Sequence, residues 1–314
     1  MRILLTNDDG IDCDGLRFLA SALEKRKNDE VYVVAPDGNR SGVSHSISMH
    51  GPIRLVRRSE RVWACSGTPA DCTIVAALGG LPFIPDLVVS GINVGPNIGT
   101  DLVYSGTAAA ARQAALHGIP GVAFSLACFE APFQWEAAAR FASDHLEDFI
   151  ALCVPDIFVN VNIPNRAEGP IDLLRTFPSR RRYNDSLSVF RAPDSNEYCF
   201  IESGGIDTEP EAGSDQDAVL RGHASVSPIF IHPIVLRDVC TEAPDHAAAS
   251  ARPYASGFDV AQREGISKDF PGTAAAQAVS RPERISAREA SVPTDTTQSI
   301  GAGPLGTGNA RVKG

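Results

Sequence analysis

Short apolar runs alternate with amphipathic stretches along the first 240 residues. Residues 2–6 (RILLT) and 31–35 (VYVVA) are mainly apolar runs, as is typical of strands buried on both faces. Between them, residues 16–23 carry apolar side chains at helical spacing. This alternation predicts an α/β fold in which parallel strands are joined by right-handed crossovers.

The same pattern continues further along the chain. Residues 108–117 are mostly small, which predicts a helix that packs closely against the sheet. Four further segments have strand-like composition, at residues 86–90, 121–126, 157–162 and 224–236. Residues 169–222 have few long apolar runs and many polar residues, so we expect hairpins or a small lobe beside the main sheet.

The chain changes character near its end. Beyond Thr241 it is rich in Ala, Ser, Pro, Gly and Thr and has almost no bulky apolar residue. Such a segment buries too little apolar surface to offset the entropy of ordering, which predicts a disordered tail. The expected organisation is a folded domain over residues 1–240 and a low-complexity tail over residues 241–314.

Composition narrows the range of partners. The formal net charge of −10 has the wrong sign for a surface that binds a nucleic-acid duplex or an anionic membrane. No stretch approaches the ~20 apolar residues of a spanning helix, and no secretory signal is visible. The seven cysteines are scattered, as expected of reduced thiols, so we predict a cytoplasmic protein.

An acidic turn follows the first predicted strand. In an open parallel sheet ligands bind at the carboxyl ends of the strands, where Asn7-Asp8-Asp9-Gly10 lies. Adjacent carboxylates repel one another, and a hard cation bound to both would relieve that repulsion. The alternative is an ordinary turn in which Asp9 caps the next helix and Asp8 forms an Asx turn. For this turn alone the two interpretations are equally good.

Three more segments follow strands or open a helix at the same predicted edge, at residues 39–42 (NRSG), 90–97 (SGINVGPN) and 104–107 (YSGT). Each is compatible with an ordinary turn, since Gly, Asn and Ser are common in turns. Together they offer hydroxyl and amide oxygens, which suit Mg²⁺, Mn²⁺ or Ca²⁺ better than zinc. A helix that begins near residue 105 would also present its backbone N–H groups to an anion such as phosphate.

At this point the sequence resembles the SurE family, the survival-protein nucleotidases. The resemblance rests on five separated segments in the family's order and covers roughly residues 1–236; the segments are 7–10, 35–42, 66–72 (SGTPADC), 90–97 and 104–109. It implies a Rossmann-like three-layer core with a mostly parallel sheet and a smaller projecting portion. It also implies a homo-oligomer, dimer or tetramer, that hydrolyses nucleoside 5′- or 3′-monophosphates, and some members also act on short polyphosphate.

The resemblance assigns roles to the motif residues. It implies one divalent metal ion per subunit, Mg²⁺, Mn²⁺ or similar, with Asp8, Asp9, Ser41 and Asn93 as ligands. Substrate phosphate is expected at Asn97, Ser105, Gly106 and Thr107. A metal that binds both a phosphoryl oxygen and water would make hydroxide available, with Asp8 or Asp9 as general base. Direct attack by an aspartate is less favoured, because a metal ligand is poorly placed to be a nucleophile.

Several residues near these motifs have less certain roles. His45 is either a surface imidazole or a proton donor to the leaving alcohol. Asp71 either belongs with the Gly67-Thr68-Pro69 loop next to the site or caps the helix that continues to residue 78; the two interpretations are equally good. The aromatic residues Tyr104, Phe124 and Phe133 are expected to pack in the core or loops and not to stack on a base.

The chain departs from the family pattern near its C-terminus. Residues 224–229 (ASVSPI) resemble a family segment, but Phe230-Ile231-His232 stands where many members have His-x-Asp. We expect His232 to be structural.

Two other interpretations of the chain remain: a regulatory module that binds metal and nucleotide without turnover, and a dinucleotide enzyme. The latter is disfavoured because the first turn lacks the G-x-G-x-x-G glycines.

Overall fold

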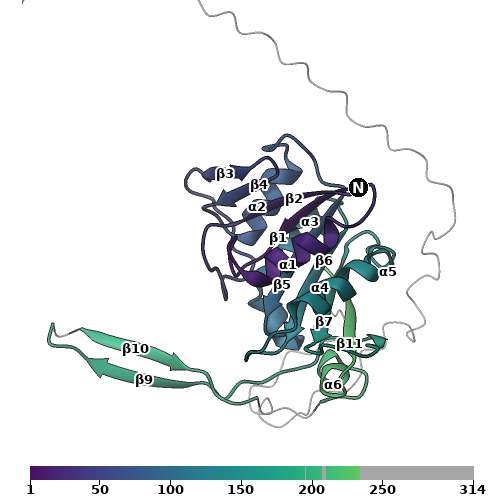
Figure 1. The fold of residues 1–314 in the computed structure, drawn as a ribbon. Coiled ribbons are helices and arrows are strands. Elements are labelled where there is room, and N and C mark those ends of the chain that lie inside the picture. Colours follow the sequence, from purple (N-terminus) through teal and green to yellow (C-terminus); the bar gives the residue numbers. More distant parts are fainter. Residues whose placement is uncertain (195, 207–209, 234–314) are drawn as a thin grey trace, which may run out of the picture. The chain divides into compact units, whose positions relative to one another are not determined.

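The computed structural model describes residues 1–194, 196–206 and 210–233, in which a mostly parallel sheet of nine strands forms the centre (Figure 1). The strand order is β3-β4-β2-β1-β5-β6-β7-β11-β8, and β3 and β11 each pair antiparallel with a neighbour. The strands are β1 (Arg2–Thr6), β2 (Glu30–Pro36), β3 (Leu55–Ser59), β4 (Val62–Cys65), β5 (Leu87–Val94), β6 (Gly121–Ala127), β7 (Ile157–Pro164), β8 (Leu173–Arg175) and β11 (Ala224–Phe230).

Helices cover both faces of this sheet, which gives the predicted three layers. Successive strand residues point to opposite faces, so Ile3 and Leu5 pack with α1 (Asp14–Leu23), α4 (Trp135–Asp144) and α5 (Leu146–Ile150). Leu4 instead joins the core beneath α2 (Pro69–Ala77) and α3 (Gly106–Leu116). A short η1 turn (Gly99–Val103) precedes α3, and α6 (Asp215–Leu220) packs against β11.

The small residues of α3 allow the close helix–sheet packing that the sequence predicts. Ala108, Ala111 and Ala114 are fully buried. A Cβ atom added to Gly121 at the start of β6 would lie 2.2 Å from the carbonyl oxygen of Ala111. Only a residue without a side chain fits at that point, so this contact sets the distance between helix and sheet.

The central strands agree with the sequence predictions to within a few residues, and β1 has the predicted bounds. The antiparallel pair of β3 and β4 and the helices α4, α5 and α6 were not predicted. No helix in the described part of the chain has the length and apolar character needed to cross a bilayer. The predicted tail, and the end of the strand-like segment 224–236, lie outside the described residues.

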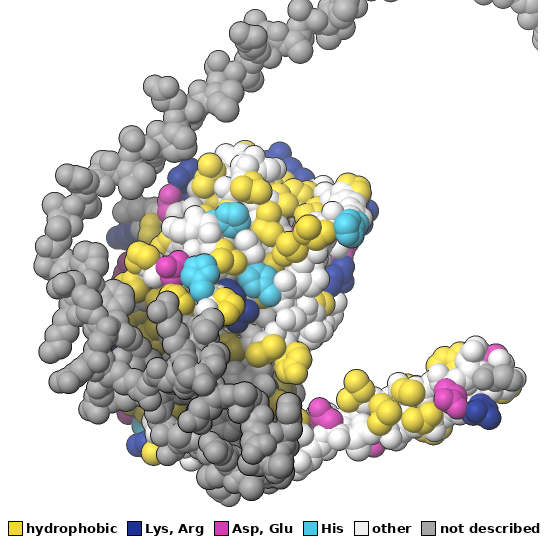
Figure 2. Space-filling view, turned by 180° about the vertical axis from the view of Figure 1, so that it is seen from behind, with side chains coloured by type: hydrophobic (Ala, Val, Ile, Leu, Met, Phe, Trp, Pro, Cys, Tyr) yellow, Lys and Arg dark blue, Asp and Glu magenta, His cyan; other side chains and the backbone are white. Residues whose placement is uncertain are grey.

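A two-stranded hairpin forms the smaller portion that was predicted within residues 169–222. It pairs β9 (Ser186–Arg191) with β10 (Glu197–Glu202) in antiparallel register and projects from the sheet (Figure 1). Figure 2 shows apolar side chains along this hairpin; they include Leu187, Val189, Phe190, Phe200 and Ile201, all of them exposed.

Candidate active site

Asn7 and Gly10, the first and last residues of the turn after β1, hold that turn together. The Asn7 side-chain amide donates to the carbonyl oxygen of Gly10 at 3.0 Å, and the Gly10 N–H donates to Asn7 Oδ1 at 3.3 Å. Gly10 has φ +107°, a conformation that favours glycine. The side chain that caps α1 belongs to Cys13. Asp9 therefore does not cap α1, and the turn is held by Asn7 and not by an Asx turn at Asp8.

Asp8 is buried against the start of α3. One carboxylate oxygen accepts the Thr107 backbone N–H at 3.0 Å, and the other accepts the Thr107 hydroxyl at 2.5 Å. Only 3% of Asp8 is exposed. Burial raises the pKa of Asp8, and the bonds from Thr107 oppose that shift. The N-terminal end of α3 thus stabilises the charge of this carboxylate.

Asp9 faces the beginning of the loop after β5. Its Oδ2 accepts the Val94 backbone N–H at 3.2 Å. Burial and the neighbouring Asp8 charge raise the pKa of Asp9 to about 6. The two carboxylates together create an unbalanced negative charge at the carboxyl end of β1.

Backbone hydrogen bonds bring two further predicted ligands to this turn. The Arg40 N–H donates to the Asp8 carbonyl oxygen at 2.6 Å, which holds Ser41 beside Asp8. The Asn93 side-chain nitrogen donates to the carbonyl oxygens of Val94 and Gly95, each at 2.9 Å. These bonds fix the Asn93 amide and leave its Oδ1 as the acceptor atom for a ligand.

A cavity of about 400 Å³ opens at this edge of the sheet, within the size range of small-molecule sites. It is lined by Asp8, Ser41, Asn93, Asn97 and Ser105 among others. The structure thus gathers most of the predicted site residues, with Asp9 bonded to a lining residue.

Gly106 and Thr107 lie behind Asp8 and do not line the cavity. A Cβ on Gly106 would meet the Asp8 side chain at 2.8 Å, and Thr107 donates both of its polar hydrogens to Asp8. In this structure both residues serve to hold Asp8. Their contact with substrate stays a prediction.

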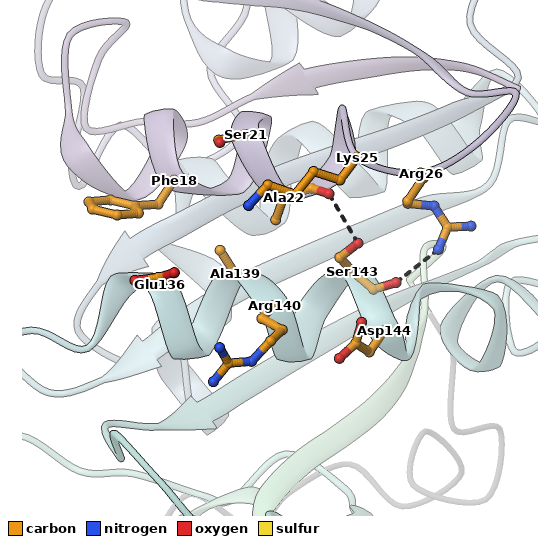
Figure 3. A pocket seen from close by; sticks show the side chains of 10 residues that line it. All are labelled: Phe18, Ser21, Ala22, Lys25, Arg26, Glu136, Ala139, Arg140, Ser143 and Asp144. Atoms are coloured by element: carbon orange, nitrogen blue, oxygen red, sulfur yellow. Dashed lines mark hydrogen bonds between the residues drawn. The ribbon is translucent and has the colours of Figure 1, made fainter.

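A larger cavity of about 600 Å³ lies between α1 and α4, away from the predicted residues (Figure 3). Its side chains include Phe18, Ala139 and Arg140. Across it, Arg26 donates to the Ser143 carbonyl oxygen at 2.8 Å. The cavity is a gap between two helices that are linked by such bonds, and none of the predicted site residues lines it.

Asn97 is held by a buried amide cluster that sequence reasoning missed. Its N–H donates to Asn162 Oδ1 at 2.8 Å, and its carbonyl oxygen accepts from Asn160 and Asn162 at 2.9 and 3.1 Å. Its own side-chain nitrogen donates to Ser125 Oγ at 2.8 Å. The signal was present in the sequence, because two fully buried asparagines interrupt the otherwise apolar strand VNVNIP.

Arg181 is the only cation among the described residues that line the cavity. Its guanidinium donates to Asp101, and 10% of its side chain is exposed. The Thr100 hydroxyl fixes the Arg181 backbone through bonds at 2.9 and 3.1 Å. Within the described chain, Arg181 Nε and the Tyr183 hydroxyl are buried without a hydrogen-bond partner. In the sequence this segment falls in the polar lobe, and no motif connects it with the site.

Three residues near the motifs, His45, His232 and Asp71, do not line the cavity. His45 Nε2 lies 2.7 Å from the Gln113 side-chain oxygen. His232 follows β11 and contacts Asp156 at 3.3 Å, as a structural histidine would. Asp71 forms a capping box at the start of α2, as the second of its two interpretations predicted.

An open, mostly parallel sheet with paired carboxylates and a polar cavity at its carboxyl edge defines a Rossmann-like α/β protein, and that edge is where sheets of this kind bind ligands. Residues 3–185 match the family described as Survival protein SurE. The chain belongs to the SurE family.

Its relatives cover nearly all of the described fold. The 5′-nucleotidase SurE of Pelobacter propionicus is 40% identical over 233 residues, which is 74% of this chain and 94% of the relative. The 5′-nucleotidase SurE of Thermosipho melanesiensis is 38% identical over 237 residues, 74% and 92% of the two chains. The crystal structure of the SurE protein from Aquifex aeolicus superposes with a TM-score of 0.64 at 34% identity, and covers 76% of this chain and 97% of its own.

Proposed function

We propose that this protein hydrolyses nucleoside monophosphates to nucleoside and phosphate with the help of one divalent metal ion. Its relatives are named 5′-nucleotidases, and the chain is an enzyme of that class. The observation that carries the proposal is the pair of acidic side chains, Asp8 and Asp9, at the edge of a nucleotide-sized cavity.

The residues present fit a hard cation. Asp8 and Asp9 supply carboxylate oxygens, Ser41 a hydroxyl, and Asn93 an amide oxygen, which is a donor set suited to Mg²⁺ or Mn²⁺. Burial raises the pKa of both carboxyls, and the Asp8 charge raises that of Asp9 further, so a bound cation would favour their ionised forms. The described residues include no cluster of three His, Cys, Asp or Glu side chains, so the neutral Ser41 and Asn93 oxygens would complete the set.

The metal would supply charge neutralisation at the phosphate and a nucleophilic water. The protein itself holds and orients the carboxylates and the residues that would contact the phosphate. Thr107 keeps the Asp8 carboxylate in one orientation, and the Val94 N–H holds Asp9 through Oδ2. Asp8 or Asp9 would take the proton of the water as general base. Asn97, fixed by its amide neighbours, and Ser105 are the cavity residues that would contact the phosphoryl oxygens.

The proposal includes the finer activities that the family resemblance suggests, on 3′-monophosphates and short polyphosphate. Asn97 and Ser105 would contact a phosphoryl group in the same way in either of these ligands. The six cysteines of the described residues are free thiols, which supports the predicted reducing, cytoplasmic location.

Phosphate release from AMP tests the proposal. Purified protein would be assayed with EDTA, with Mg²⁺ and with Mn²⁺, alongside Asp8→Asn. Asp12→Asn is the matched control, because Asp12 is an exposed aspartate of the same loop that does not line the cavity. We expect metal-dependent release that is lost in Asp8→Asn and kept in Asp12→Asn. Intact AMP after long incubation with either metal would favour the alternative of a binding module without turnover.

The hairpin supports the predicted homo-oligomer. A two-stranded hairpin is marginal alone in water, and exposed apolar side chains such as Phe200 and Ile201 are what a subunit interface would cover. Phe200→Asp should reduce the mass measured by light scattering. Leu78→Asp makes the same change at an exposed apolar residue beyond the end of α2 and should not. Equal masses for wild type and Phe200→Asp would contradict a role of the hairpin in assembly.

A further inference from the structure

The cavity has an aromatic part as well as a polar part. Phe129, Tyr104 and Tyr183 line it together with the predicted site residues. Phe129 is 71% exposed, the largest fraction for any aromatic side chain among the described residues, and Tyr104 is 57% exposed. A single exposed ring is ordinary, but exposed rings grouped at the wall of one cavity are typical of a ligand-binding surface.

The Phe129 ring rests on bare backbone. A Cβ atom added to Gly95 would lie 2.1 Å from Phe129 Cε1, and Gly95 has φ +87°. Any other residue at position 95 would displace the ring. Gly95 stands between Asn93 and Asn97, so the ring lies directly beside the loop that carries the polar site residues.

The loop that carries Phe129 is tied down on both sides of the ring. The Cys128 N–H donates to the Leu126 carbonyl oxygen at 2.8 Å, and the Cys128 thiol donates to the Glu130 carbonyl oxygen at 3.0 Å. These bonds hold the backbone on either side of Phe129, and the ring lies against Gly95 with most of its surface open. An exposed aromatic ring at a cavity is a platform on which another flat ring can stack.

The other aromatic candidates do not have this geometry. Phe124 is fully buried and packs against Phe149 with ring centroids 5.5 Å apart. Phe133 packs against Trp135 at 5.2 Å. Both are packing residues, as the sequence analysis expected, whereas Tyr104 lines the cavity.

We propose that Phe129 is the residue on which the nucleobase of the substrate stacks, and that it makes the enzyme prefer nucleotides to phosphomonoesters without a base. This inference rests on the proposed function. A nucleoside monophosphate has one charged end and one flat apolar end. The cavity matches both, with carboxylates and amides around Asp8 and aromatic rings at Phe129 and Tyr104. Purines, with the larger ring surface, should gain more than pyrimidines.

Steady-state kinetics on AMP and on ribose 5-phosphate test the inference, because the second substrate keeps the sugar and phosphate and lacks the base. Stacking on an aromatic side chain contributes roughly 5- to 150-fold in affinity. We expect Phe129→Ala to raise the KM for AMP by about this factor with little change in kcat. Its kcat/KM for ribose 5-phosphate should equal that of the wild type. Phe129→Tyr keeps the flat ring and should behave as wild type, whereas Phe129→Leu keeps only the bulk and should resemble Phe129→Ala.

Two results would overturn the inference. In one, Phe129→Ala loses activity on both substrates equally, which would indicate a structural role. In the other, both substrates are hydrolysed as by the wild type. A wild type that releases phosphate from neither substrate refutes the proposed function instead. Calorimetric titration of AMP into wild type and Phe129→Ala then decides on stacking by itself, since equal dissociation constants would reject it.

Discussion

Replacing Thr107 with Val tests how Asp8 is prepared to hold a metal. Valine has nearly the same shape as threonine, so the change removes the hydroxyl and little else. The 2.5 Å bond to one oxygen of Asp8 is lost, while the backbone bond of 3.0 Å to the other oxygen remains. The Asp8 carboxylate then keeps its position at the start of α3 but loses one of the two contacts that orient it.

The expected loss can be estimated in two ways. A hydrogen bond to an ionised group contributes about 1.5–3 kcal/mol. Residues that orient a metal ligand change metal affinity by about 10–100-fold, and each tenfold corresponds to about 1.4 kcal/mol. The two estimates agree. Because the backbone bond remains, we expect the lower end, which is a dissociation constant for Mn²⁺ that rises by roughly tenfold.

Calorimetric titration of Mn²⁺ alone measures this constant without reference to turnover. Thr107→Ser is the matched control, since it keeps the hydroxyl and loses only a methyl group, and it should bind Mn²⁺ as the wild type does. Unchanged affinity in Thr107→Val would refute the argument that the Thr107 hydroxyl orients a ligand. A wild type that binds no Mn²⁺ would refute the metal site as a whole.

Three further predictions concern the frame around the cavity. In Gly10→Ala the added Cβ would sit on a backbone with φ +107° and lie within 3.1 Å of the Gly38 backbone, so the free energy of unfolding measured with urea should fall by about 1–3 kcal/mol. Gly42→Ala, with φ +77° and open space around the new Cβ, should lose less stability. The Asp215 carboxylate accepts the backbone N–H groups of Gly99, Ser179 and Gln216 at 2.7, 2.9 and 2.8 Å, and Asp215→Asn replaces one of its two acceptor oxygens with an NH₂ group. It should lower the unfolding free energy by about 1–3 kcal/mol, and an unchanged urea midpoint would contradict this. Arg181→Gln removes the only cation among the described cavity-lining residues and should raise the KM for AMP roughly tenfold, and an equal KM would show that this cation does not contact the substrate.

The central sheet could be predicted because its strands are buried on both faces. β1, β2, β6 and β7 are nearly continuous apolar runs, a signal that depends only on local sequence. The edge strand β3 could not be found in this way. Four of its five residues are exposed, and its sequence LVRRS has no apolar run. Its pairing with β4 depends on the neighbouring strand and not on its own composition.

The grouping of the candidate metal ligands could be predicted for a geometric reason. These residues lie at or after the carboxyl ends of strands, and parallel strands end at one edge of the sheet. Arg181 and its loop follow no such rule. They reach the cavity because Asp215 bonds the N–H groups of both Gly99 and Ser179, which are far apart in the chain. A contact among three distant segments leaves no periodic pattern in any of them.

The start of α3 shows how a correct element can have an unexpected role. The sequence predicts a helix there whose N–H groups receive phosphate. In the structure the Thr107 N–H is occupied by Asp8. The helix end therefore orients a proposed metal ligand instead of offering this N–H to phosphate. The proposed phosphate contact then falls to Asn97, a cavity residue that the buried amides of Asn160 and Asn162 hold in place.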